Sequence, residues 1–174
     1  MIRIKIGILI YMFKKFLAFI DSLTFNNQSR VLSPYCGTLI PSKLINNVNI
    51  AHNVIGISVG VIPNCNEVRA PINGQIIKIS GYHNGLTITN DIFSLILNFG
   101  LLRDKYPLSA FDLKIKEGDK VKAGDLLLTY DYDELYKIDR NFVCTLTVKQ
   151  KKSSSTYSFV SIKSVDFQTI LINL

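Results

Sequence analysis

The sequence predicts an all-β protein, an antiparallel sandwich or barrel, preceded by a short amphipathic helix. Three observations support this fold class. From about residue 31 onward, short segments rich in β-branched residues alternate between apolar and polar side chains. Gly, Pro and Asn separate these segments at close intervals, which is typical of antiparallel architectures. With 174 residues and 48% apolar side chains, the chain can fill one substantial hydrophobic core.

Residues 1–30 differ from the rest of the chain. Over 12–23, apolar side chains recur at three- and four-residue steps, which predicts an amphipathic helix whose apolar face is Phe13, Phe16, Leu17, Ile20 and Leu23. Two interpretations stay open: Phe13, Phe16, Leu17 and Ile20 lie in a membrane interface, or the helix docks on its own domain. The polar stretch 25–30 follows as a linker. We therefore expect an N-terminal extension over 1–30 and a β domain over 31–174.

Within the β domain, nine segments carry the strand pattern: 37–40, 57–62, 74–79, 86–89, 94–97, 126–130, 143–148, 157–162 and 169–172. Short helices are expected around 41–46 and over 133–138, where Asp131 or Asp133 is the capping residue. The run 149–155, rich in Lys and Ser, predicts a solvated hairpin loop.

Composition excludes several function classes. The net charge is 20 − 13 = +7, yet no basic stripe interleaved with aromatic residues favours nucleic-acid binding. Cys36, Cys65 and Cys144 lack the spacing of a disulfide framework or a zinc site, which fits a reducing cytoplasm. The early apolar run 6–13 is far shorter than the ~20 residues that cross a bilayer, and no cleavage site follows it. We expect no metal and no cofactor.

Two glycine-containing segments have the most specific pattern. In 68–76, a rigid Pro enters a turn that leaves through an Asn-Gly pair, two residues that are able to take a positive φ. In 115–127, Gly118 and Gly124 bracket a single inward valine, and Val121 and Leu126 are expected to fill the core. Both segments indicate tight turns in a β architecture, and neither supplies a catalytic group.

The pairing of these two turns is shared by three groups of related sandwich proteins. Biotinyl and lipoyl carrier domains need a lysine at a hairpin tip, and 80–97 contains none. Zinc peptidases of the lysostaphin type need a His-x-His pair, whereas this chain has only His52 and His83. The third group resembles the chain along almost its whole length. Matching stretches are 12–17, 33–37, 56–63, 68–74, 98–100, 110–111 and 117–131, with His83 between them.

That third group is the glucose-type enzyme IIA family of the bacterial phosphoenolpyruvate-dependent sugar phosphotransferase system. The resemblance implies the antiparallel sandwich of the glucose-permease IIA kind (duplicated hybrid motif). It also implies two facing histidines, one of which accepts a phosphoryl group from a histidine-containing phosphocarrier protein and passes it to a sugar transporter IIB/IIC domain. By this resemblance, Val48, Ile50 and Ile96 belong to an apolar surface that docks these partners.

The resemblance places His83 on the supporting histidine and Asn98 on the phosphoacceptor, 98 − 83 = 15 residues later. An amide nitrogen is not a useful nucleophile, because its lone pair is delocalised into the carbonyl. Leu102 also stands where the family has an aspartate. We therefore expect a cytoplasmic enzyme IIA-like component that is not catalytically competent and acts as a binding or regulatory module. Two alternatives remain: an active phosphocarrier that uses His83, and a peripheral membrane-binding module.

Overall fold

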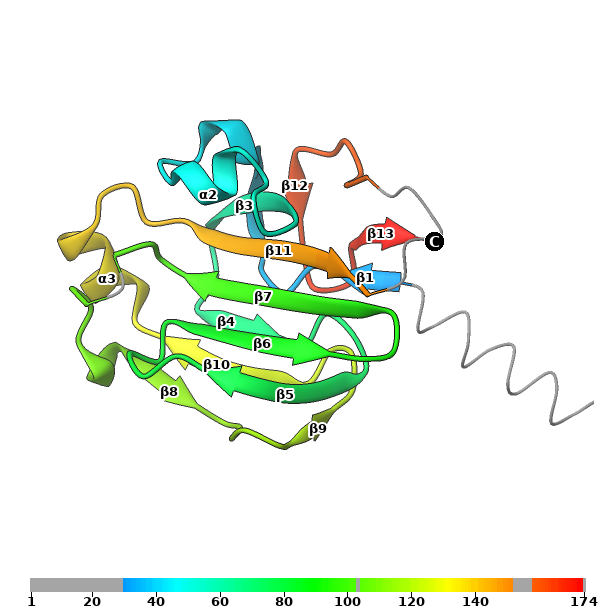
Figure 1. The fold of residues 1–174 in the computed structure, drawn as a ribbon. Coiled ribbons are helices and arrows are strands. Elements are labelled where there is room, and N and C mark those ends of the chain that lie inside the picture. The colour runs from blue at the N-terminus through cyan, green and yellow to red at the C-terminus, as the bar shows by residue number, and fades with distance from the viewer. Residues whose placement is uncertain (1–29, 103, 152–157, 174) are drawn as a thin grey trace, which may run out of the picture.

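A computed structural model of the chain describes residues 30–102, 104–151 and 158–173. It shows antiparallel sheets around one main core, with a few short helices at the periphery (Figure 1). The strands are β1 (Arg30–Leu32), β2 (Gly37–Pro41), β3 (Ile57–Pro63), β4 (Glu67–Arg69), β5 (Gly74–Ile79), β6 (Gly85–Thr89), β7 (Phe93–Phe99), β8 (Phe111–Leu113), β9 (Lys120–Val121), β10 (Leu126–Tyr130), β11 (Cys144–Gln150), β12 (Ser164–Val165) and β13 (Ile170–Asn173). The helices are η1 (Ser42–Leu44), α2 (Val48–Ala51), η2 (Leu108–Ala110) and α3 (Tyr132–Ile138).

Three sheets build the described part of the chain. The largest has the strand order β12-β2-β3-β11-β7-β6-β5-β9, a second has the order β4-β10-β8, and β1 pairs with β13. Every strand pair in residues 30–102, 104–151 and 158–173 is antiparallel. The predicted all-β antiparallel fold class is therefore confirmed, whereas the predicted N-terminal helix lies outside the described residues.

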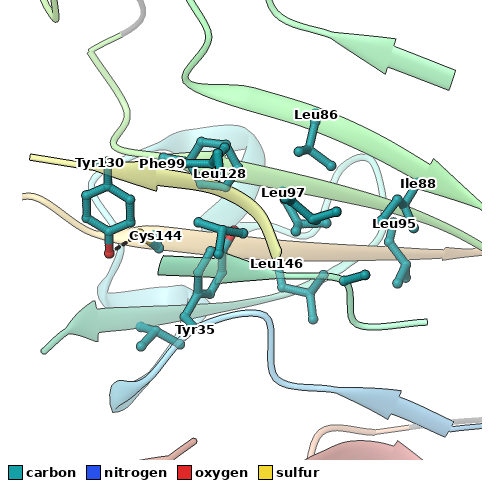
Figure 2. Packing of buried hydrophobic residues seen from close by; sticks show 14 of the residues in the cluster. Tyr35, Leu86, Ile88, Leu95, Leu97, Phe99, Leu128, Tyr130, Cys144 and Leu146 are labelled. Atoms are coloured by element: carbon teal, nitrogen blue, oxygen red, sulfur yellow. Dashed lines mark hydrogen bonds between the residues drawn. The ribbon is translucent and has the colours of Figure 1, made fainter. Parts of the chain in front are cut away.

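The core forms where the largest sheet faces the β4-β10-β8 sheet. Along β7, Phe93, Leu95, Leu97 and Phe99 are buried while the residues between them are half-buried, the two-residue period of a strand. Leu128 and Tyr130 of β10 pack among the β7 and β11 side chains, as Figure 2 shows. These inward residues leave the alternate side chains of β7 and β11 on the opposite face.

Most predicted elements are confirmed with slightly longer bounds, and α3 is capped by Asp131, whose carboxylate accepts from the Glu134 N–H at 2.9 Å. The strand predicted over 157–162 is wrong. Residues 158–162 form no strand, because the described backbone there makes one bridging hydrogen bond, from Val160 N to Leu171 O. The hairpin loop predicted over 149–155 starts too early, since β11 continues to Gln150.

Within 115–127, the turn at Gly118 and the turn at Gly124 are built in the same way, each with an aspartate that accepts from a backbone N–H. Gly118 and Gly124 have φ of 94° and 92°, as predicted. At the Asn-Gly pair, neither Asn73 nor Gly74 adopts the positive φ that these residues allow. Glycine is needed there for space, since a Cβ would lie 2.5 Å from the Thr89 carbonyl oxygen. Val121 is buried as predicted.

The leucines after the second turn differ from their prediction. Leu126 was expected in the core, but it is only half-buried, while Leu127 and Leu128 are fully buried. The β10–β4 pairing shifts register between Leu126 and Leu128, so simple strand alternation does not hold at this end of β10. In the described residues, no helix is both long enough and apolar enough to cross a membrane.

Candidate functional site

An open hollow of about 470 Å³ lies on the outward face of the largest sheet. Its walls come from β5, β6, β7 and β11, from the turn at 80–84, and from the segment that contains α2. Four asparagines line it: Asn47, Asn49, Asn84 and Asn98. Between them stand apolar side chains, chiefly Ile50, Ile55, Ile96 and Leu101. The hollow is thus a mixed amide and aliphatic surface.

Strand alternation explains why Asn98 reaches this hollow. Because Leu97 and Phe99 point into the core, Ile96 and Asn98 are presented on the opposite face of β7. The neighbouring strand places Gly85 directly across from Asn98 in the β6–β7 register. A Cβ at Gly85 would lie 3.1 Å from Asn98 Oδ1, so the glycine makes room for the amide.

Asn98 is held by contacts on its far side. Its Nδ2 donates to the Thr145 hydroxyl at 3.1 Å, and this leaves Oδ1 on the Gly85 side of the amide. Below it, the buried Tyr35 hydroxyl donates to the carbonyl oxygens of Thr145 at 2.9 Å and of Asn98 at 3.3 Å. Burial, and then the nearby Cys144 thiol, raise the pKa of Tyr35 well above 10.0. Tyr35 therefore stays a neutral donor that anchors two strands under the hollow.

His83 occupies a different place. It lies in the turn between β5 and β6 with φ of 57°, and its N–H donates to Ser80 O at 2.9 Å. The flanking Tyr82 and Asn84 line the hollow, whereas His83 is not among its lining residues. His83 thus lies two residues before Gly85, the residue of β6 that pairs with Asn98 in the β6–β7 register.

Comparison with known proteins assigns this chain to a family. Residues 29–154 match the family model of the phosphoenolpyruvate-dependent sugar phosphotransferase system, EIIA 1. The chain belongs to this family. Among solved structures, it is similar to the glucose permease IIA from Mycoplasma capricolum, with a TM-score of 0.75 and 19% sequence identity over 82% of this chain and 93% of that one. That similarity confirms the fold.

A second solved structure is much less similar. Csd3 from Helicobacter pylori gives a TM-score of 0.46 and 12% identity over 71% of this chain and 32% of that chain, a likeness too slight to add to the family assignment.

The three residues of the apolar docking surface predicted for this EIIA-family chain lie in two different environments. Ile50 and Ile96 line the hollow, and Ile50 is 9% exposed. Val48 stands on α2 with 73% of its surface exposed and does not line the hollow. Sequence reasoning missed its exposed neighbours Leu44, Val54 and Ile55, which together with Val48 form an apolar rim. The membrane-binding residues predicted at Phe13, Phe16, Leu17 and Ile20 lie outside the described residues.

The described lining of the hollow in this EIIA-family chain contains one charged side chain. Lys78 is the charged residue among its described lining, which includes no carboxylate and no imidazole. Leu102, just beyond Leu101, is exposed to solvent. Across the part of the chain that the structure describes, no three His, Cys, Asp or Glu side chains gather as a metal site would require. Amides and hydroxyls at this site can bind by hydrogen bonds, and none of the lining groups is itself an imidazole base.

Proposed function

We propose that this EIIA-family component does not carry a phosphoryl group and acts as a binding or regulatory module of the sugar phosphotransferase system. The observation that carries the proposal is the amide of Asn98 in the hollow, at the position that the resemblance assigns to the phosphoacceptor. Phosphoryl transfer needs a positioned nucleophile and groups that stabilise the transferred charge. An asparagine provides no such nucleophile, because its nitrogen lone pair is delocalised.

The orientation of Asn98 supports the same conclusion. With Nδ2 directed to Thr145, the amide offers Oδ1 on the Gly85 side, and a carbonyl oxygen can only accept hydrogen bonds. Phosphoryl oxygens are acceptors as well, so the two would repel. His83, the supporting donor that the resemblance implies, stands in the turn at 80–84 beside the lining residues Tyr82 and Asn84. The lining side chains themselves include no imidazole that could attack phosphorus.

Docking is the function that remains for this surface. Four apolar residues of the segment that contains α2 are exposed, and exposed apolar patches are typical of interaction sites: Leu44, Val48, Val54 and Ile55. The partners that we propose are the histidine-containing phosphocarrier protein and the sugar transporter IIB/IIC domain. The setting would be the cytoplasm, with peripheral membrane contact through Phe13, Phe16, Leu17 and Ile20 as a further element of the proposal.

Intact-mass measurement after incubation with phosphoenolpyruvate, enzyme I and the phosphocarrier protein tests the proposal. The mass should stay unchanged, while an active EIIA-family protein in the same reaction should gain one phosphoryl group. An acid-labile gain on this chain would overturn the proposal. If that gain disappeared in His83→Gln and persisted in Asn98→Ala, His83 would be the acceptor instead.

A further inference from the structure

We propose that the hollow around Asn98 is a binding site for a small, neutral, polyhydroxylated ligand, a monosaccharide or related polyol. This inference deepens the proposed function and rests on it, because it gives the same hollow a ligand in place of a phosphoryl group. The volume of about 470 Å³ falls within the ~300–1,000 Å³ of small-ligand sites. The identity of the ligand follows from the polar atoms, the charge and the apolar residues of the lining.

The polar lining offers both acceptors and donors. Asn98 leaves Oδ1 as an acceptor. Ser58 Oγ donates to Gly56 O, so its 2.9 Å contact with Thr147 Oγ1 uses the Thr147 proton and leaves the Thr147 lone pairs for a ligand. Asn84 Oδ1 already accepts from Ser80 Oγ at 3.2 Å, so its Nδ2 is the group that a ligand would meet. A polyol suits this mixture of donors and acceptors, because each of its hydroxyls can both donate and accept.

The acceptors in the lining favour a neutral ligand over an anion. Lys78 is the charged side chain in the described lining, and its position on β5 is exposed to solvent. Sites for phosphate groups use arginine pairs, or backbone N–H groups at a helix N-terminus, to surround the anion with donors. Here the acceptors Asn98 Oδ1 and Thr147 Oγ1 face the space where an anion would have to lie.

The apolar part of the lining fits the other half of a sugar. Ile55 and Ile96 stand between the amides, and Tyr82 exposes 48% of its surface in the turn at the edge of the hollow. A monosaccharide ring carries hydroxyls around its edge and C–H groups on its faces. An aromatic ring with a polar tip can pack on such a C–H face while its hydroxyl reaches solvent or the ligand. The hollow therefore offers amides to the hydroxyl-bearing edge of a sugar ring, and aliphatic or aromatic groups to the C–H face of the ring.

Titration of the isotope-labelled full chain, followed by backbone and side-chain amide NMR, tests this inference. The probes are free hexoses, pentoses and polyols at millimolar concentration, each compared with its phosphate ester and with inorganic phosphate. Saturable shifts should appear at the side-chain amides of Asn84 and Asn98 with a neutral sugar. Tyr82→Ala should weaken that binding about tenfold, whereas Tyr82→Phe should retain most of it. Tyr136→Ala removes a partly exposed tyrosine that does not line the hollow and should leave binding unchanged.

A matched pair of variants at the central amide tests whether Asn98 Oδ1 acts as an acceptor for the sugar. Asn98→Asp keeps an oxygen acceptor, so neutral sugar binding should survive, whereas Asn98→Leu should abolish it. No saturable shift with any neutral sugar would overturn the inference, even if the intact-mass experiment supports the proposed function. Binding of the phosphate esters and of inorganic phosphate, but not of the free sugars, would overturn it as well. Failure of the proposed function would instead be seen as a mass gain.

Discussion

Tyr35 and Thr145 are 110 residues apart in the sequence, and the Tyr35 hydroxyl donates to the Thr145 carbonyl at 2.9 Å. The Tyr35 ring also meets Phe99 edge-on, with ring centroids 6.2 Å apart. This one side chain therefore ties the link after β1 to β7 and β11 directly beneath the candidate site. The carbonyl oxygen of Asn98 is the second acceptor of the Tyr35 hydroxyl, at 3.3 Å.

Tyr35→Phe should lower the free energy of unfolding by about 1 kcal/mol, the usual net value of one buried hydrogen bond. The ring contact with Phe99 would remain, so the loss would come from the hydroxyl alone. Urea denaturation measures it, with Tyr136→Phe on the surface of α3 as the control that should change little. An unchanged midpoint for Tyr35→Phe would mean that the hydroxyl does not hold the strands together.

Gly85→Ala should crowd the Asn98 amide. The new Cβ would lie 3.1 Å from Asn98 Oδ1 and 3.3 Å from the Leu97 carbonyl oxygen, so one of these groups must shift. Overpacking of this kind costs about 1–3 kcal/mol, and the Asn98 side-chain amide signals should move in an NMR spectrum. Gly81→Ala is the matched control, because no atom lies within 4 Å of its added Cβ. Equal effects of the two substitutions would contradict the close approach at Gly85.

Val48→Asp should weaken binding of a protein partner at the apolar rim without unfolding the chain. Val48 is 73% exposed, so an added charge there costs little in the free protein but must be desolvated in a complex. Surface plasmon resonance with immobilised phosphocarrier protein measures the effect, and about a tenfold loss of affinity is expected. Ile162→Asp, which alters an exposed isoleucine outside the hollow, should bind normally. Equal loss in both variants would show that net charge, rather than the rim, determines binding.

Sequence patterns predicted the long elements because their periodicity is local. The alternation in β7 is sufficient to place Asn98 and Ile96 on the same face, opposite Leu97. Strands such as β9 and β12 escaped prediction because two residues cannot show a period, and they exist through pairing with Gly74, Gln75, Gly37 and Thr38. The chain's local signals thus define its long strands, while tertiary pairing defines the short ones.

The candidate site was less accessible to sequence reasoning. The turn at 80–84 depends on two backbone hydrogen bonds of Ser80. Its carbonyl oxygen accepts from the His83 N–H at 2.9 Å, and its N–H donates to the Gly85 carbonyl oxygen at 2.7 Å. No pattern in those residues specifies a positive φ at a histidine, so the conformation of the turn at His83 could not be predicted. The rim residues Leu44 and Val54 were missed for a related reason. An apolar residue in a short irregular segment indicates burial as readily as exposure.

Asp125→Ala should loosen the second of the two repeated glycine turns. In each turn the aspartate carboxylate accepts from a backbone N–H three residues earlier, at 2.9 Å from Asp119 to Lys116 and 2.7 Å from Asp125 to Lys122. Loss of one such bond should cost about 1 kcal/mol in urea denaturation. Asp125→Asn retains an oxygen acceptor and should recover most of that stability. If the alanine and asparagine variants were equally destabilised, the carboxylate charge rather than the turn bond would be responsible.

Stability should fall as the pH rises above about 9, and Cys36 should contribute to that fall. Burial, and then the neighbouring Cys65 thiol, raise the pKa of Cys36 from 9.0 to about 12. Between these values the folded chain keeps the thiol proton that the unfolded chain has lost. The unfolded state then binds fewer protons, so the free energy of unfolding decreases with pH across this window.

Urea denaturation at neutral pH and at about pH 10 measures that dependence. Cys36→Ser carries no group that titrates in this range, so its stability should decline less steeply than that of the parent chain. Some decline should persist in the variant, because burial also raises the pKa of Tyr35 and of Cys144. An identical slope in the parent and in Cys36→Ser would mean that Cys36 is as accessible to water in the folded chain as in the unfolded one.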